Sequence, residues 1–397
     1  MKKIFGTMVL AALIAACIGC NAKIPDYLVV EGTTVVGFTD EIPENLVIPN
    51  GITEIGEDAF VFCNLIKSVT LPKSVRTIGD EAFGGCESLE RVSFSEGLVT
   101  IGMSAFEACS SLKSVTLPRS VRTIGDSAFW ECESLERVSI FDGVETIDDG
   151  AFGETDIKTI TIPGSVKRLG YGAFYGCESL RSITLPNSIT EIYGGTFSYC
   201  ISLRSITIPG SVRTIGVYQL AEDDDDSTLE FRTPFYMCTS LESVIIEDGA
   251  ETIGAGAFYG CESLRSVSIP GSVRRIGEAA FINCASLTGV DIPDGIESIG
   301  GFTFAGCSSL ASVVIPGSVR IIDYKAFRGC TSLASITLPA NLMATADDVF
   351  DGCTSLKELR FPGTTDQFLQ GWQSLYAKMA IPSGVGIICS DDILVTN

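Results

Sequence analysis

Apolar residues recur along the chain in short groups that alternate with turns. In segment 180–185, LRSITL, they stand at positions one, four and six, and the last three residues alternate as in a half-buried strand. Pro186 follows at once and ends the strand, because proline cannot donate to a continuing ladder. A turn, a second alternating piece of the SVRTIG type and an Ala-Phe pair complete the unit. Each unit therefore predicts two short extended segments and two corners.

The unit returns along nearly the whole chain. Its phenylalanine occurs at Phe60, Phe83, Phe106, Phe129, Phe152, Phe174, Phe197, Phe235, Phe258, Phe281, Phe304, Phe327 and Phe350. The step is 23 residues, except for 22 after Phe152 and 38 after Phe197. A fixed period of this length indicates a stacked solenoid, in which each coil contacts only its neighbours. We therefore expect one β-rich solenoid of about 13 coils, with the phenylalanine rings in its core.

The segments before the first coil have other patterns. Residues 1–20 begin with Lys2 and Lys3, continue through an apolar run and end in small residues, which is typical of a removable export signal. In residues 21–44, the run YLVVEGTTVVGF has two β-rich pieces around a Glu-Gly pair. This pattern predicts a hairpin that covers the exposed strand edges of the first coil, and the repeats then extend over residues 45–362.

The long step after Phe197 contains an acidic insertion at residues 217–231. It lies between the SVRTIG piece and the Ala-Phe corner, so we expect it to protrude without interrupting the sheet. Its carboxylates could chelate calcium, but contiguous acids are more often solvated.

Charge and composition exclude several functions. The formal net charge is −22, from 27 basic and 49 acidic residues, which argues against nucleic acid as a partner. The chain has no histidine, so the commonest general base and zinc ligand are missing. We therefore expect a protein that is not an enzyme, with no cofactor and no metal.

The unit C-x-S-L-x-S-I-x-L-P-x-S-V-x-x-I-G-x-x-A-F, as in residues 109–129 and 261–281, resembles the 23-residue leucine-rich repeat of BspA-like bacterial surface proteins. The resemblance implies a curved solenoid with a parallel sheet on its concave face. It also implies display at the cell surface and binding to extracellular matrix or plasma proteins, or to other bacterial surfaces. Residues 363–397 resemble the capping segment that follows the last coil in that family.

A second resemblance concerns the end of the export signal. Residues 17–20, CIGC, resemble a bacterial lipobox, although Cys17 stands where leucine is usual. The resemblance implies that Cys20 carries a lipid and anchors the chain to the outer membrane or cell surface. The alternative is a plain secretory signal with an incidental cysteine.

Twelve of the fifteen cysteines share one position in the repeat. They are Cys63, Cys86, Cys109, Cys132, Cys177, Cys200, Cys238, Cys261, Cys284, Cys307, Cys330 and Cys353, and Thr155 takes the place in the shortened coil. Disulfides between neighbouring coils are one interpretation, since export permits them. A ladder of reduced, buried thiols is the interpretation we favour, because one small side chain per coil suits a packed corner. Zinc fits less well, because its sites use paired spacings.

Function should lie on the outward columns of the sheet, because core positions report only packing. One column contains Lys67, Glu90, Lys113, Glu136, Lys158, Arg181, Arg204, Glu242, Arg265, Thr288, Ala311, Ala334 and Lys357. Its signs alternate as far as Lys158, as a self-neutralising ladder would. Arg181 and Arg204 break the alternation. We therefore expect a ligand-binding surface that includes Arg181, Arg204 and Arg265, with Ile245 and Val314 as exposed apolar neighbours.

The SVRTIG piece shows a second alternation. Arg76, Arg122, Lys167, Arg213, Arg274 and Arg320 recur in every other coil, with Glu145, Glu251 and Glu297 between them. We interpret these as interleaved surface charges along one flank, each pair worth at most about 1 kcal/mol.

Two alternatives to a binding protein remain open. One is an architectural envelope protein without a host ligand. The other is a carbohydrate-active β-solenoid that uses paired carboxylates. Against the enzyme, Glu90, Glu136, Glu242 and Asp291 are separated by one or more coils and form no close acidic pair.

Overall fold

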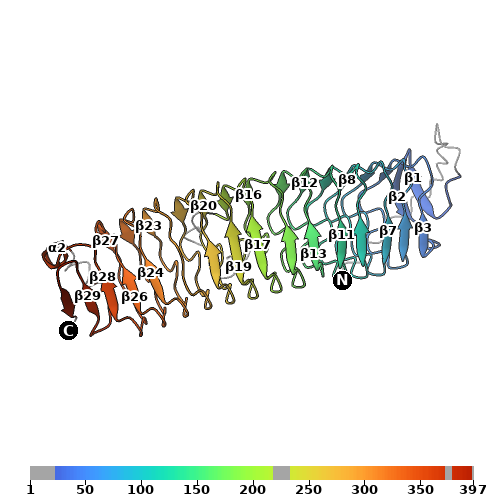
Figure 1. Ribbon diagram of the computed structural model, residues 1–397. Coiled ribbons are helices and arrows are strands. Elements are labelled where there is room, and N and C mark those ends of the chain that lie inside the picture. Colours follow the sequence, from blue (N-terminus) through green and yellow to red (C-terminus); the bar gives the residue numbers. More distant parts are fainter. Residues whose placement is uncertain (1–22, 218–232, 372–377, 396–397) are drawn as a thin grey trace.

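The computed structural model describes residues 23–217, 233–371 and 378–395. The chain forms an elongated β-solenoid of about 14 turns with parallel sheets and little helix, so the predicted solenoid is confirmed. Two rows of short strands run along its length (Figure 1). We call the row formed by the LRSITL-type segments the front sheet, and the row formed by the SVRTIG-type segments the back sheet.

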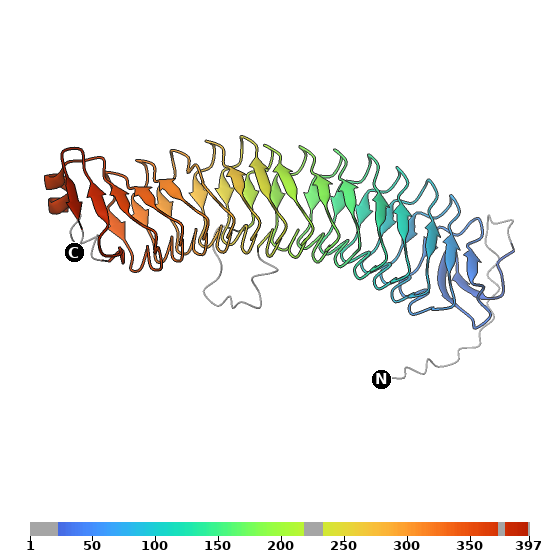
Figure 2. The same cartoon turned by 60° about the horizontal axis from the view of Figure 1, so that its bottom comes forward.

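The front sheet contains one strand from almost every coil. Its strands are β3 (Asn45–Val47), β5 (Ser68–Thr70), β7 (Arg91–Ser93), β9 (Ser114–Thr116), β11 (Arg137–Ser139), β13 (Thr159–Thr161), β15 (Ser182–Thr184), β17 (Ser205–Ile208), β19 (Ser243–Ile246), β21 (Ser266–Ser268), β24 (Ser312–Val314), β26 (Ser335–Thr337), β28 (Glu358–Arg360), β29 (Gly386–Ile388) and β30 (Ile393–Val395). Successive strands up to β29 run in the same direction (Figure 2). Equivalent repeat positions in neighbouring coils pair in register, as Ile206 with Val244 and Val244 with Val267.

The back sheet contains shorter strands. They are β4 (Glu54–Ile55), β6 (Thr77–Ile78), β8 (Thr100–Ile101), β10 (Thr123–Ile124), β12 (Thr146–Ile147), β14 (Arg168–Leu169), β16 (Glu191–Ile192), β18 (Thr214–Ile215), β20 (Thr252–Ile253), β22 (Arg275–Ile276), β23 (Ser298–Ile299), β25 (Ile321–Ile322) and β27 (Ala344–Thr345). The coils approach closely here. A Cβ added to Gly125 would lie 2.6 Å from the carbonyl carbon of Gly102, so a side chain at this position would force the two coils apart.

The acidic insertion leaves both sheets continuous across it. Strand β17 pairs directly with β19, and β18 with β20. The expected path of the insertion falls almost entirely on residues 218–232, which lie outside the described residues.

The phenylalanine column fills the core between the sheets. Each ring stacks on the next, with centroid separations such as 5.1 Å for Phe235–Phe258 and 5.4 Å for Phe258–Phe281. These rings are fully buried. The prediction that they lie inside the solenoid is correct, and the rings couple each coil to both of its neighbours.

The N-terminal end is covered by a hairpin. Strands β1 (Leu28–Glu31) and β2 (Thr34–Phe38) pair antiparallel, and β2 then pairs in parallel with β4 of the back sheet. Phe38 extends the ring column, with its centroid 5.8 Å from that of Phe60. The hairpin therefore covers the back sheet and the core.

At the C-terminal end it is the front sheet that is covered. Strand β29 pairs in parallel with β28 and adds a turn to the front sheet, and β30 pairs antiparallel with β29. Helix α2 (Thr365–Gly371) lies between β28 and β29 in the chain and starts at a reciprocal cap. The backbone N–H of Thr364 donates to the Gln367 side chain, and the N–H of Gln367 donates to the Thr364 hydroxyl.

Candidate functional site

The charged column of the front sheet runs from coil to coil. Backbone hydrogen bonds join most of its neighbouring members, as from Arg181 N–H to Lys158 O at 2.9 Å and from Glu242 N–H to Arg204 O at 2.8 Å. Between Arg181 and Arg204 no such bond occurs among the described residues, because the strand pairing is interrupted between β15 and β17. The side chains of neighbouring coils therefore lie side by side on one face, about 4.8 Å apart at the backbone.

The first part of this column neutralises itself, as the alternation predicts. Lys67 Nζ lies 3.0 Å from Glu44 Oε2, and Lys158 Nζ lies 3.0 Å from Glu136 Oε1. The hydrogen bond and the charge of Lys158 lower the pKa of Glu136. Glu90 has a partner in its own coil, with its Oε2 3.6 Å from Arg91 Nη1. Most of these charges have a partner within the protein, and Lys113 is the cation of this part without an ion pair among the described residues.

Arg181 and Arg204 are cations in consecutive coils of the column. Both side chains are exposed, and in the described part of the chain neither guanidinium has an ion pair or a hydrogen bond. Together with Ser202 and Ser240 they line one hollow on the surface. Arg265 is also exposed and unpaired among the described residues, but it lies beyond Glu242, whose coil separates it from Arg204.

The two apolar candidates lie in different places. Ile245 is 52% exposed on β19 and pairs with Thr207 of β17, in the coil of Arg204. Val314 is 63% exposed on β24, and the coils of Ser268 and Asp291 lie between it and Ile245. The structure therefore brings Arg181, Arg204 and Ile245 into one patch and leaves Arg265 at its margin and Val314 outside it.

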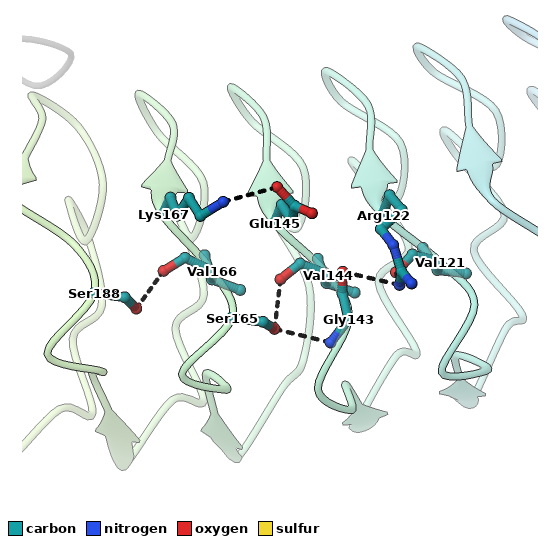
Figure 3. A network of polar contacts seen from close by, with 9 residues as sticks. All are labelled: Val121, Arg122, Gly143, Val144, Glu145, Ser165, Val166, Lys167 and Ser188. Atoms are coloured by element: carbon teal, nitrogen blue, oxygen red, sulfur yellow. Dashed lines mark hydrogen bonds and ion pairs between the residues drawn. The ribbon is translucent and has the colours of Figure 1, made fainter.

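The back sheet carries the second charge alternation. Lys167 Nζ lies 3.0 Å from Glu145 Oε2, and Arg213 pairs with Glu251, as predicted (Figure 3 shows the first pair). Arg122 instead donates from Nη1 to the backbone carbonyl of Gly143, at 3.1 Å. The neighbouring turn is closed by Ser165, whose hydroxyl accepts from Gly143 N–H at 3.0 Å.

The two-coil repeat has a physical cause in these turns. Gly143 has φ 135°, a backbone conformation that suits glycine. In the next coil, the corresponding turn carries Ser165, which contacts Gly143, and this alternation of glycine and serine turns repeats along the flank. Gly97 with Ser120 and Gly249 with Ser272 repeat the contact at 2.9 and 3.0 Å. The back-sheet cations donate hydrogen bonds to turn carbonyls or form ion pairs with carboxylates of the same flank. The role of these cations is therefore structural.

The cysteine column forms a ladder of buried free thiols. From Cys86 onward, each thiol donates to the phenylalanine carbonyl of the preceding coil, at 3.0 Å for Cys238 to Phe197 and 3.3 Å for Cys261 to Phe235. In the shortened coil the Thr155 hydroxyl lies 3.3 Å from the Cys177 thiol. Burial raises the pKa of the Cys307 thiol to about 12. The favoured interpretation of a packed, reduced ladder describes the structure, and no metal-binding group of three or more His, Cys, Asp or Glu occurs among the described residues.

Sequence reasoning missed a second hollow, at the shortened coil. It is lined by Glu133, Glu154, Thr155, Asp156, Tyr175, Gly176, Glu178, Ser179 and Tyr199. Burial, together with the charges of Glu131, Glu133 and Glu178, raises the pKa of Glu154. The 22-residue step was the signal that could have located it. The outward direction of these side chains could not be read from the step alone.

Several predictions fall outside the described residues. The export signal and Cys20 belong to residues 1–22. Within the described ranges, no helix has the length and apolar character needed to cross a membrane.

Comparison with known proteins gives consistent matches. The BspA type leucine rich repeat region, in six copies, matches residues 37–155, 145–234 and 231–357. A solved leucine-rich repeat protein from Bacteroides ovatus is 27% identical, over 93% of this chain and 97% of that chain, with a TM-score of 0.55. A leucine rich cell surface protein from Faecalibacterium prausnitzii is 24% identical, over 89% of this chain and 94% of that chain, with a TM-score of 0.43. The pneumococcal vaccine antigen PcpA is 20% identical, over 93% of both chains, with a TM-score of 0.48. No protein with a curated description matches the chain.

Proposed function

Because this chain belongs to the BspA-type leucine-rich repeat family, we propose that it is an exported surface protein that binds other macromolecules through its front sheet. Proteins of the extracellular matrix or plasma, or of other bacterial surfaces, are the proposed partners. A relative from Faecalibacterium prausnitzii is itself described as a cell surface protein.

One observation carries the proposal. Lys67 and Lys158 of the front column have a carboxylate at 3.0 Å, whereas Arg181 and Arg204 have none among the described residues. If the column served only to keep the sheet soluble, its charges would continue to alternate in sign, because like charges directly opposite each other destabilise a sheet. Two adjacent unpaired arginines beside the exposed Ile245 suit a partner instead, with charge for steering and apolar area for affinity.

We expect the double substitution Arg181→Glu/Arg204→Glu to abolish binding to a partner of the front sheet, or to weaken it at least about tenfold, since it reverses the steering charge. Binding of the purified protein to immobilised fibronectin, fibrinogen and laminin at low and high salt measures this. The matched control is Arg274→Glu/Arg320→Glu, which makes the same change of charge on the back sheet. Binding retained by the first variant and lost by the second would move the site to the other face. Absence of binding to all three proteins would favour the architectural alternative.

We propose further that a lipid on Cys20 anchors the protein, on the support of the lipobox-like residues 17–20. The Cys20→Ala variant should then leave the membrane fraction, and metabolic labelling with a radioactive fatty acid should mark the original protein and not the variant. A variant that remains in the membrane fraction without the label would show that a different attachment holds it.

A further inference from the structure

We infer that Arg181 and Arg204 form a clamp for a single carboxylate group, presented by an acidic side chain of a partner protein. This inference rests on the proposed function, because it names the chemistry by which the front sheet would recognise its partner. It concerns the hollow lined by Arg181, Ser202, Arg204 and Ser240.

The first argument is the charge left over on the sheet. Successive coils, about 4.8 Å apart, place both arginines at one hollow. Two like charges in this relation repel each other. The next coil on one side contributes Lys158, whose charge is already neutralised by Glu136 at 3.0 Å. The pair therefore keeps a local excess of positive charge that an anion would relieve.

The second argument is the chemistry of the lining. Guanidinium groups present N–H donors in a planar fork and have no acceptor, and hydroxyl groups can also donate. All four side chains that line the hollow can therefore donate to the same anion. A carboxylate offers two oxygens with several lone pairs, which two adjacent forks can share through charge-assisted hydrogen bonds.

The third argument limits the size of the anion. On one side of the arginine pair the immediate neighbour is Glu242, whose N–H donates to Arg204 O at 2.8 Å. On the other side the neighbour is Lys158, whose charge is neutralised by Glu136 at 3.0 Å. A long chain of sulfates or phosphates along the column would therefore meet a repelling carboxylate on one side and a neutralised cation on the other. A single anionic group meets only the two arginines.

The fourth argument indicates a protein as the source of the carboxylate. Ile245 pairs with Thr207 of the neighbouring strand. Thr207 follows Arg204 by three residues, so Ile245 lies about 10 Å from Arg204 along the strand direction. Its side chain is 52% exposed. A segment in the polyproline II conformation has three residues per turn and rises about 3.1 Å per residue, so an acidic and an apolar residue three positions apart lie on one face, about 9 Å apart. Such a segment would contact both features at once.

The test uses arginine Nε–Hε signals in NMR spectra of the purified protein. The probe is a short blocked peptide that carries one aspartate and, three positions away, one leucine. Its asparagine counterpart and a heparin-derived oligosaccharide serve as comparison ligands. We expect the aspartate peptide to shift the Arg181 and Arg204 signals saturably, and the asparagine peptide to bind at least about tenfold more weakly, because it loses charge-assisted hydrogen bonds.

The substitutions Arg181→Gln/Arg204→Gln should weaken binding of the aspartate peptide by at least about tenfold. Arg91→Gln/Arg137→Gln is the matched control, because these arginines lie on the same sheet beside their own carboxylates, at 3.6 and 3.7 Å. It should change binding by less than about twofold. Equal weakening in both variants, or a heparin fragment that shifts the same signals more strongly than the peptide does, would overturn the carboxylate clamp.

The same variants separate this inference from the proposed function. If Arg181→Gln/Arg204→Gln still binds a matrix protein that the original protein binds, the clamp is wrong and the binding function stands. If the aspartate peptide shifts both arginine signals but no matrix or plasma protein binds, the clamp stands and the proposed partners are wrong.

Discussion

Replacing Phe258 by alanine should lower the stability of the solenoid by about 3–5 kcal/mol, the usual cost of removing a buried aromatic ring. The ring is fully buried and stacks between Phe235 and Phe281, with centroid separations of 5.1 and 5.4 Å. Its removal leaves a cavity that two coils share. Because a solenoid gains stability from the contacts between neighbouring coils, the loss should appear in the coils on both sides.

Thermal melting and amide hydrogen exchange measure this effect. Melting should occur at a lower temperature, and protection should fall most in the backbone amides of the coils that contain Phe235 and Phe281. Phe62→Ala is the matched control, since that ring is 74% exposed and the same atoms are removed. Equal melting temperatures for the two variants would mean that the phenylalanine column does not couple the coils.

The repeat could be predicted from sequence because one geometric rule applies in every coil. A 23-residue step places each phenylalanine on the previous one, so the core follows from the spacing alone. Thr155 shows how far the rule extends, because it occupies the cysteine position of the shortened coil and contacts Cys177 there. A position that repeats in sequence is a position that stacks in space.

The surface was harder to predict because its contacts are set by side-chain direction as well as by spacing. The alternation predicted a self-neutralising ladder, and Lys158 with Glu136 forms one. Glu90 instead contacts Arg91 of its own coil, which the column alone could not show. Ile245 and Val314 are both exposed, as their outward positions predict, but only Ile245 lies in a coil adjacent to the arginine pair. Long flexible side chains choose among several partners within reach, and spacing alone does not rank these partners.

The two caps illustrate another limit. Sequence reasoning predicts a hairpin before the first coil, but it does not say which sheet the hairpin joins. In the structure β2 extends the back sheet, whereas β29 extends the front sheet at the other end. Among the described residues, no further strand pairs with the outer edge of β3 at one end or of β27 at the other, and these two edges belong to different sheets. End-to-end stacking of two molecules would bring a covered edge against an open one, which disfavours growth into a fibre.

The thiol ladder should protect nearly every cysteine of the repeat column from alkylation in the native protein. Burial raises the pKa of Cys307 from its ordinary value of 9.0 to about 12. Alkylation requires the thiolate, and the raised pKa lowers the thiolate fraction by orders of magnitude at neutral pH. Burial also excludes the reagent, so the native protein should react at least about a hundredfold more slowly than the unfolded protein. The effect should persist from neutral pH to about pH 9, because the folded-state pKa lies well above this range.

Mass spectrometry after brief treatment with iodoacetamide, with and without denaturant, measures the protection. Unfolded protein should take up the label at every ladder cysteine, whereas native protein should remain unlabelled at positions such as Cys261 and Cys307, which are fully buried. Cys389 provides the internal comparison, because it is 8% exposed and lies outside the ladder, so it should react first. Unlabelled cysteines that stay unreactive in denaturant until a reductant is added would show disulfides between coils. In that case the solenoid would be held by covalent links in place of the hydrogen bonds from each thiol to the preceding phenylalanine carbonyl.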